Sequence, residues 1–120
     1  MIFDTNVLIY LSKNLLNPQA LFLEDAGISV ITKIEALGYS FQNIEEYEII
    51  NSICSILKVI PVSDAIAEAT INLRKNYRIK LPDALIYATA FVESKPLLTN
   101  NMADFASLDN KVILINPFSL

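Results

Sequence analysis

Four acidic residues stand where the chain passes from an apolar strand or a turn into a helix: Asp4, Glu35, Asp83 and Asp104. Carboxylates bind hard divalent cations such as Mg²⁺, and a bound cation polarises phosphates and lowers the pKa of its water. If the fold gathers the four acids, their like charges raise one another's pKa unless a cation balances them. The chain has 13 acidic and 9 basic residues, so these four match its net charge of −4, although any four acids would do so. The pattern indicates metal-assisted hydrolysis.

Other hydrolytic sites are excluded by what the sequence lacks. It has no histidine and one cysteine, Cys54, which excludes a Cys/His zinc site, an internal disulfide and a nucleophile activated by a histidine base. Cys54 lies among apolar residues and is expected to be buried. The two glycines, Gly27 and Gly38, are too few for a Walker loop or a dinucleotide fingerprint. An enzyme of this composition must depend on its carboxylates.

Each acid also has a purely structural explanation. Asp4 can cap the helix that begins at residue 5. Glu35 stands three residues after Thr32, the spacing of a capping box at a helix start. Asp83 follows a proline in a first helical turn, where the helix dipole stabilises a carboxylate, and Asp104 lies in a turn that favours local hydrogen bonds. Taken singly, each residue fits this structural explanation at least as well as it fits a metal site.

Four of the nine basic residues fall within seven positions: Arg74, Lys75, Arg78 and Lys80. They come just before Asp83. Cations are favoured in the last turn of a helix, so these residues fit a solvated helix end. They fit equally well a rim that binds the phosphates of a polyanion beside an acidic centre. Both interpretations stay open. Tyr77, inside the cluster, can stack on a base, but its place in an apolar stripe favours core packing.

Short apolar strands alternate with helices along the chain. Strands are expected at residues 1–3, 28–31, 59–62, 97–98 and 112–115, helices at 5–11, 18–25, 32–38, 43–57, 63–77 and 82–92, and a turn or short helix at 101–106. This alternation is typical of an α/β fold with a central, mainly parallel β-sheet flanked by α-helices on both faces. Ligands of such sheets bind outside the carboxyl ends of the strands. Asp4, Glu35 and Asp104 follow three of the strands, so we expect them to meet at this edge.

Length and composition indicate one folded domain, residues 1–120. Hydrophobic residues make up 53% of the chain and charged residues 18%, which is far from the composition of a disordered protein. No apolar run reaches the roughly 20 residues of a membrane span, so we expect a cytoplasmic protein without a membrane anchor. The apolar surplus also favours an interface with another subunit or partner.

Four segments together resemble the motifs of PIN domains. They are Met-Ile-Phe-Asp4-Thr-Asn6-Val-Leu-Ile-Tyr, Thr32-Lys-Ile-Glu35-Ala-Leu, Leu81-Pro82-Asp83-Ala84-Leu-Ile-Tyr-Ala-Thr-Ala and Leu98-Thr99-Asn100-Asn101-Met-Ala-Asp104-Phe105. No single motif is specific, but their order and spacing match the family over nearly the whole chain. The resemblance implies a single PIN-like domain, a Mg²⁺- or Mn²⁺-dependent ribonuclease site and often a homodimer. It also implies a set of roles: principal metal-site acids Asp4, Glu35 and Asp83, a fourth acid Asp104 acting through water, and supporting polar groups Asn6 and Thr99.

The compact form most resembles VapC-type toxin ribonucleases of type II toxin–antitoxin systems. This resemblance implies an RNA substrate, products with a 5′-phosphate and a 3′-hydroxyl, and a small antitoxin whose C-terminal segment covers the site. The chain is short between its first two motifs, which bears on how a partner docks. Two alternatives remain. One is a PIN-like module that binds RNA or protein without cutting, against which the four acids argue. The other is an aspartate-nucleophile phosphatase, which usually has a second aspartate where this chain has Asn6.

Overall fold

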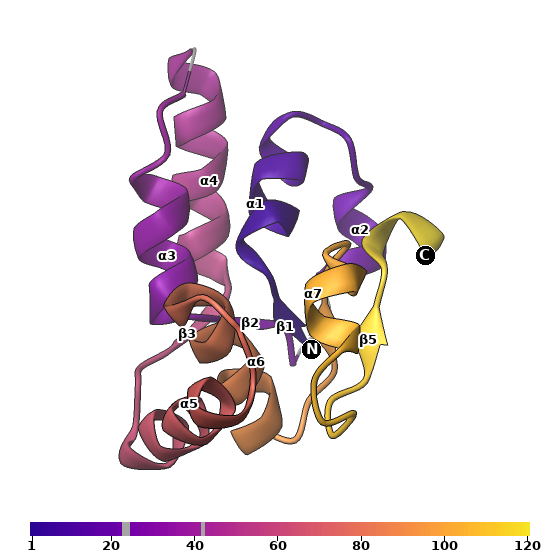
Figure 1. The fold of residues 1–120 in the computed structure, drawn as a ribbon. Coiled ribbons are helices and arrows are strands. Elements are labelled where there is room, and N and C mark those ends of the chain that lie inside the picture. Colours follow the sequence, from indigo (N-terminus) through magenta and orange to yellow (C-terminus); the bar gives the residue numbers. More distant parts are fainter. Residues whose placement is uncertain (23–24, 42) are drawn as a thin grey trace.

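The computed structural model describes residues 1–22, 25–41 and 43–120, and it places short strands and helices in alternation. The strands are β1 Ile2–Phe3, β2 Gly27–Ser29, β3 Lys58–Ile60, β4 Leu97–Leu98 and β5 Leu114–Ile115. The helices are α1 Thr5–Ser12, α2 Pro18–Leu21, α3 Val30–Leu37, α4 Ile44–Ile56, α5 Asp64–Asn76, α6 Leu81–Val92, α7 Met102–Ala106 and a terminal 3₁₀ turn, Pro117–Ser119. Figure 1 shows the order of these elements.

The five strands form one sheet in the order β3-β2-β1-β4-β5, and every pair of neighbours is parallel. After β1 the chain moves outward to β2 and β3, and then returns to add β4 on the other side of β1. The strand order therefore reverses between β1 and β4. In parallel sheets this reversal opens a crevice at the carboxyl ends of the two strands, where ligands bind.

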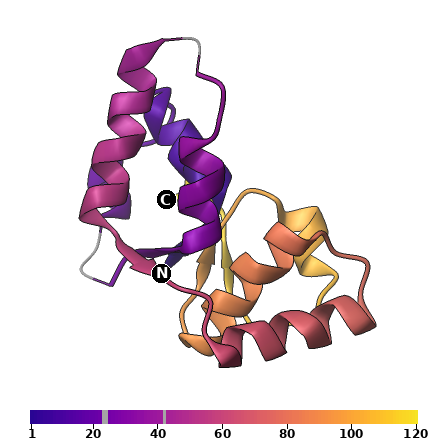
Figure 2. The same cartoon turned by 90° about the vertical axis from the view of Figure 1, so that its left-hand side faces the viewer.

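Helices cover both faces of the sheet, as the alternating strand residues require. Phe3 and Leu98 belong to one buried cluster with residues of α1 and α4, whereas their neighbours Ile2 and Leu97 belong to a second cluster with α5 and α6. Successive side chains of a strand point to opposite faces, so one short strand contributes to both cores. Figure 2 shows α3 and α4 standing together on one side of the molecule and α5 and α6 on the other. The predicted α/β class is confirmed.

The start of α3 differs from the sequence prediction. A strand was expected at residues 28–31 and a helix from Thr32, but β2 ends at Ser29 and α3 begins at Val30. The Ser29 hydroxyl oxygen accepts the Ile31 N–H at 3.2 Å and caps the helix. The β-branched run Val30–Ile31 favours a strand locally, yet the cap and tertiary packing override that preference.

Other boundaries shift for local reasons. β3 ends at Ile60 rather than residue 62, because Pro61 has no N–H to continue the ladder. The helix expected at 18–25 ends at Leu21, and residues 23 and 24 of that prediction lie outside the described residues. Gly27 lies beyond this helix and is the first residue of β2. A Cβ atom there would lie 3.1 Å from the carbonyl oxygen of Lys58, so the close approach of β2 to β3 favours glycine.

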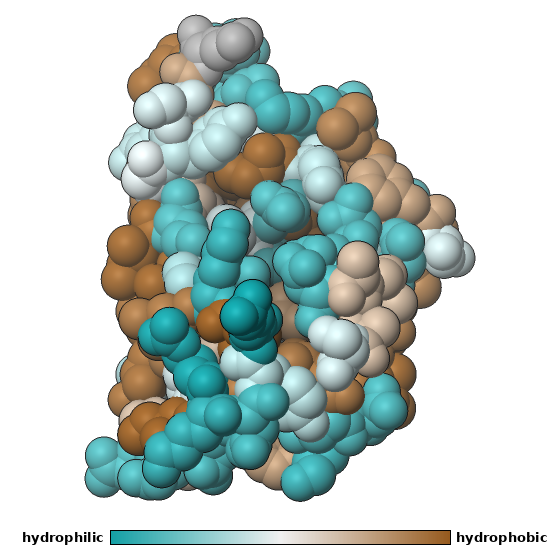
Figure 3. All heavy atoms as spheres, viewed as in Figure 1, coloured by the Kyte–Doolittle hydropathy of each residue, from teal (hydrophilic) through white to brown (hydrophobic). Residues whose placement is uncertain are grey.

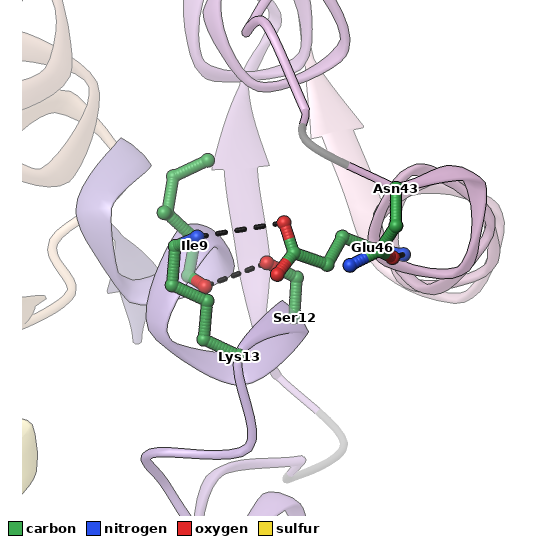
Figure 4. Close-up of polar contacts among 5 residues, drawn as sticks. All are labelled: Ile9, Ser12, Lys13, Asn43 and Glu46. Atoms are coloured by element: carbon green, nitrogen blue, oxygen red, sulfur yellow. Dashed lines mark hydrogen bonds and ion pairs between the residues drawn. The ribbon is translucent and has the colours of Figure 1, made fainter.

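α3 and α4 form a hairpin that extends beyond the sheet beside α1 (Figure 1). The apolar side chains of α4 are only partly buried: Ile50, Ile53 and Cys54 are in the core, whereas Ile44 and Tyr47 are exposed. The Lys13 ammonium, just past α1, lies 3.4 Å from the Glu46 carboxylate of α4 (Figure 4). A partly exposed pair of this kind contributes about 0.2–1 kcal/mol, so buried apolar contacts hold the hairpin in place. No helix in the described parts of the chain has the length and apolar character needed to span a bilayer.

Candidate functional site

Asp4 lies at the point where the strand order reverses. It follows β1 directly, is 4% exposed, and its Oδ1 accepts the N–H of Thr5 at 2.7 Å as the N-cap of α1. Its Oδ2 accepts the hydroxyl of Thr99, the residue after β4, at 2.7 Å. Thr99 in turn accepts the N–H of Asn101 at 3.0 Å. The cap predicted from sequence is therefore present, and Thr99 contacts the first acid directly. Burial raises the pKa of Asp4, and the charge of Glu35 raises it further, while the Thr99 and Thr5 hydrogen bonds lower it.

Glu35 lies in the middle of α3, so the capping-box explanation of this residue is wrong. Its Oε1 accepts the hydroxyl of Thr5 at 2.8 Å. Thr32, the expected helix start, is instead a fully buried residue one turn before Glu35, with its hydroxyl 3.2 Å from that of Thr5. Since β1 and β2 are parallel neighbours, α1 and α3 begin at the same edge of the sheet, and this brings Glu35 towards Asp4.

Asp83 is in the first turn of α6, as the sequence predicted. Burial raises its pKa most, and the negative charges of Asp4, Asp104 and Glu35 raise it further, in that order. The positive charge of Lys80 lowers it. The Asp83 carboxyl is thus within electrostatic reach of the other three acids, which come from three other elements.

Asp104 lies in the first turn of α7 and is exposed. Its Oδ2 accepts the side-chain N–H of Asn101 at 3.1 Å, which is the local hydrogen bonding expected of an acid in such a turn. The negative charge of Asp104 also raises the pKa of Asp83. Asp104 therefore both forms a local hydrogen bond and acts on another acid of the cluster.

The donor set suits a hard divalent cation, because the four acids offer carboxylate oxygens and the chain has no histidine. The side chains are not arranged around an ion: within residues 1–22, 25–41 and 43–120, no three acidic or cysteine side chains lie close enough to hold one. Glu35 and Asp104 each accept a hydrogen bond from the protein, from Thr5 and Asn101 respectively. Binding would bring the acids closer together than like charges lie when no cation balances them.

A groove of about 490 Å³ adjoins the acids on the α1 and α3 side. It is lined by Thr5, Asn6, Ile9, Tyr10, Lys13, Leu15, Glu35 and Tyr39. Asn6, predicted as a supporting group, is exposed in this groove rather than hydrogen-bonded to Asp4 as Thr99 is. Tyr10 forms two hydrogen bonds with Asn100. Its ring packs against the ring of Phe118, with the two ring centroids 5.2 Å apart. In Figure 3, hydrophilic side chains gather at the middle of the face where α1, α3, α6 and α7 approach one another.

Sequence reasoning missed two residues of this site as functional candidates, Thr5 and Thr32. Both carried a usable signal. Thr5 immediately follows the acid at the end of β1, and Thr32 precedes Glu35 by three residues, a spacing that puts both on one face of a helix. Their contact with each other joins residues 27 positions apart, which no local pattern reveals.

Lys80 is the member of the basic cluster whose charge acts on one of the four acids. Arg74 and Lys75 are in the last turn of α5, and Arg78 and Lys80 are in the connection to α6; all four are exposed. Lys80 is the N-cap residue of α6 and influences Asp83 directly. Tyr77 is half-buried and packs against the second core cluster, so its predicted core role is confirmed.

Comparisons with known proteins agree with the motif resemblance. A family model described as PIN domain matches residues 1–111. Among solved structures, a toxin–antitoxin complex from Klebsiella pneumoniae is 33% identical with a TM-score of 0.78, covering 97% of this chain and 96% of that one. VapBC2 from Rickettsia felis, bound to a promoter DNA fragment, is 25% identical with a TM-score of 0.78 over 97% and 98% of the two chains. VapBC-5 from Mycobacterium tuberculosis is 26% identical with a TM-score of 0.72 over 96% of each. No curated protein matches the sequence.

Proposed function

Because the chain belongs to the PIN domain family, we propose that it is a Mg²⁺- or Mn²⁺-dependent endoribonuclease and the toxin of a toxin–antitoxin pair. One observation carries the enzymatic part: the charges of Asp4, Asp104 and Glu35 all raise the pKa of the half-buried Asp83 carboxyl. Four acids from four elements within electrostatic reach destabilise the metal-free fold, and a bound cation relieves that cost. The toxin role is supported by likeness to a toxin–antitoxin complex at 33% identity.

In this proposal Asp4, Glu35 and Asp83 hold the ion, and Asp104 acts through a water molecule. A Mg²⁺ or Mn²⁺ ion bound there would supply a water of lowered pKa and balance the charge that builds on the phosphate. Asp4 is fixed most firmly, because the Thr5 N–H and the Thr99 hydroxyl hold its two oxygens. Asn6 in the groove and Thr99 beneath Asp4 support the acids. The expected products carry a 5′-phosphate and a 3′-hydroxyl.

RNA approaches over the basic side of the site in this proposal. Arg74, Lys75, Arg78 and Lys80 would bind phosphates on either side of the cleaved bond. Lys80 lies close enough to Asp83 to lower its pKa, so it is the basic residue best placed to reduce repulsion between the acids and a phosphate. Arg74, Arg78 and Lys80 also line a shallow hollow beside Tyr77.

The test is incubation of the purified protein with a mixed RNA pool and mapping of the cut ends. We expect cleavage with Mg²⁺ or Mn²⁺, none in excess EDTA, and recovery when metal is restored. Zn²⁺ and Ca²⁺ should substitute poorly, since Zn²⁺ prefers nitrogen and sulfur ligands and Ca²⁺ takes a larger shell. Cleavage that persists in excess EDTA would overturn the mechanism.

A second candidate is a PIN-like module that binds RNA or protein without cutting. Its support is the arrangement of the side chains: no three acids in the described parts of the chain surround an ion, and Asp4, Glu35 and Asp104 each accept a hydrogen bond from the protein. The same RNA assay separates the two. RNA binding without cleavage in Mn²⁺, together with an absence of metal-induced stabilisation, would favour this candidate.

The proposed partners are a small antitoxin protein and a second copy of the chain. Large apolar side chains are exposed on α3 and α4, including Ile34 at 61%, Ile44 at 66% and Ile56 at 72%. Apolar surface of this kind is usual at protein interfaces. A cytoplasmic location follows from the proposal, because RNA and antitoxin are both made there. Light scattering and co-purification with the product of the neighbouring gene test the partners; a monomer at high concentration that captures nothing contradicts both.

A further inference from the structure

Thr5 contacts two of the four acids at once. Its backbone N–H donates to Asp4 Oδ1 at 2.7 Å, and its hydroxyl donates to Glu35 Oε1 at 2.8 Å. The first contact is the ordinary cap of α1 and needs no particular side chain at position 5. The second contact joins the start of α1 to the middle of α3, and it depends on the hydroxyl.

Thr32 fixes the direction of that hydroxyl. The Thr32 side chain is fully buried, and its oxygen lies 3.2 Å from the Thr5 oxygen. Each hydroxyl has one proton, and an ionised carboxylate only accepts. One arrangement satisfies both contacts: Thr5 donates its proton to Glu35, and Thr32 donates to the Thr5 oxygen. The result is a chain of donors that runs from Thr32 through Thr5 to Glu35.

These hydrogen bonds act against the electrostatic repulsion between Glu35 and the two acids Asp4 and Asp83. Asp4 and Asp83 both lie within reach of the Glu35 charge, and Glu35 is on a long, half-buried side chain that can turn towards solvent. A charge-assisted hydrogen bond to one of its oxygens keeps the carboxylate beside Asp4, while the other oxygen stays available. Without the donor, repulsion and side-chain entropy both favour an outward rotamer.

We propose that Thr5 and Thr32 are positioning residues that hold Glu35 beside Asp4, ready to bind the divalent cation. This inference rests on the proposed function, because it assigns the two threonines a part in that metal site. Thr5 lies in the groove beside the acids, whereas Thr32 is buried and acts only through Thr5.

The test uses Thr5→Val and Thr32→Val, which keep shape and remove one hydroxyl each, and Thr5→Ser, which keeps the hydroxyl. Thr70→Val is the matched control, since Thr70 is a buried helical threonine whose hydroxyl donates to Ile66 within α5. Partners of this kind typically alter metal affinity or activity by about 10- to 100-fold. We expect the Mn²⁺ dissociation constant, measured by calorimetry, to rise by about 10- to 100-fold in Thr5→Val and by a smaller factor in Thr32→Val. It should change little in Thr5→Ser and Thr70→Val.

Kinetics distinguish positioning from RNA contact or loss of fold. In Thr32→Val, kcat should fall while the KM for RNA is unchanged, because a buried side chain cannot touch RNA. Circular dichroism checks that each variant is folded. If Thr5→Val does not fold, the result for Thr32→Val decides whether the threonines position Glu35. Mn²⁺ binding and cleavage at wild-type levels in a folded Thr5→Val or Thr32→Val protein would overturn the inference.

A metal-free measurement separates this inference from the proposed function. The ¹³C chemical shift of the Glu35 side-chain carboxyl should change in Thr5→Val and Thr32→Val but not in Thr70→Val. If the wild type neither binds Mn²⁺ nor cuts RNA, the proposed function fails, and this shift alone decides whether the threonines position Glu35. No change in the shift overturns the positioning role; a change supports it.

Discussion

The two halves of the acidic site are built differently. Asp4 follows β1 and Glu35 is in α3, and their hydrogen-bond donors come from two other parts of the chain: Thr5, the first residue of α1, and Thr99, the residue after β4. Asp83 and Asp104 are instead carried by the first turns of α6 and α7, and the hydrogen bond of Asp104 is to Asn101 three residues away. The first half is a long-range hydrogen-bonded unit, whereas the second depends on where two helices begin.

This difference separates structural from functional effects. In the first half, an acid both supports the fold and contributes charge, so removing its side chain alters both. In the second half, the acid side chains contribute charge with little structural support. Substitutions that keep shape and remove charge should therefore affect activity in both halves, but only truncation in the first half should also destabilise the fold.

The largest effect is expected at Asp4. Asp4→Asn keeps an oxygen for the Thr5 N–H and should leave metal-free stability at or above that of the wild type, because it removes a buried charge. Cleavage of RNA should fall by at least about 100-fold. Asp4→Ala should be equally inactive and also lose about 0.5–2 kcal/mol through the missing cap. Thermal melts and RNA cleavage measure both; an active Asp4→Asn protein contradicts the metal role.

Asp83→Asn should abolish cleavage without cost to stability. As a residue that only stabilises the helix dipole, Asp83 would contribute about 0.3–1 kcal/mol, and Asp83→Asn would melt lower and cut normally. As a member of the acidic cluster, it is repelled by three other carboxylates. We therefore expect Asp83→Asn to melt no lower than wild type without metal, to lose most of the stabilisation given by Mn²⁺, and to leave RNA uncut. A protein that melts lower yet cuts normally would show that Asp83 only supports α6.

A smaller effect is expected from the basic residues. Arg74→Ala combined with Arg78→Ala should weaken RNA binding and reduce the slope of log affinity against log salt by about 1 for each phosphate that is no longer bound. Fold and Mn²⁺ affinity should be unchanged, because both side chains are exposed. Binding titrations at several salt concentrations provide the measurement. An unchanged slope would assign these residues to a solvated helix end.

The smallest effect is on the pH dependence of the metal-free protein. Burial raises the pKa of Asp4 and Asp83 above the ordinary value of 3.8 in the folded state. The folded protein therefore binds these protons more tightly than the unfolded chain does. The resulting contribution to the free energy of unfolding is fully present below pH 3.8 and is lost as the pH rises through the folded-state pKa values. The melting temperature of Asp83→Asn relative to wild type should therefore increase as the pH rises above 3.8. Melts in EDTA test this; a difference independent of pH contradicts it.

How much of the site could be predicted depended on the range of the interactions. The α/β class and the local cap at Asp4 were predicted because strand periodicity and capping depend on neighbouring residues. The capping box at Thr32 and Glu35 was predicted by the same local logic and was wrong. Thr32 and Glu35 have the three-residue spacing of a capping box, but the helix begins earlier, because the Ser29 side chain caps it.

The sequence by itself limited the candidate ligands of a cation to carboxylates and excluded other chemistries, since the chain has no histidine and one cysteine. It also determined that short strands alternate with helices. Only the tertiary structure decided that β4 lies beside β1, that Thr99 therefore reaches Asp4, and that Thr5 reaches Glu35. These contacts span 95 and 30 positions, and they form because packing of both faces of the sheet fixes the strand order. No local pattern encodes that order.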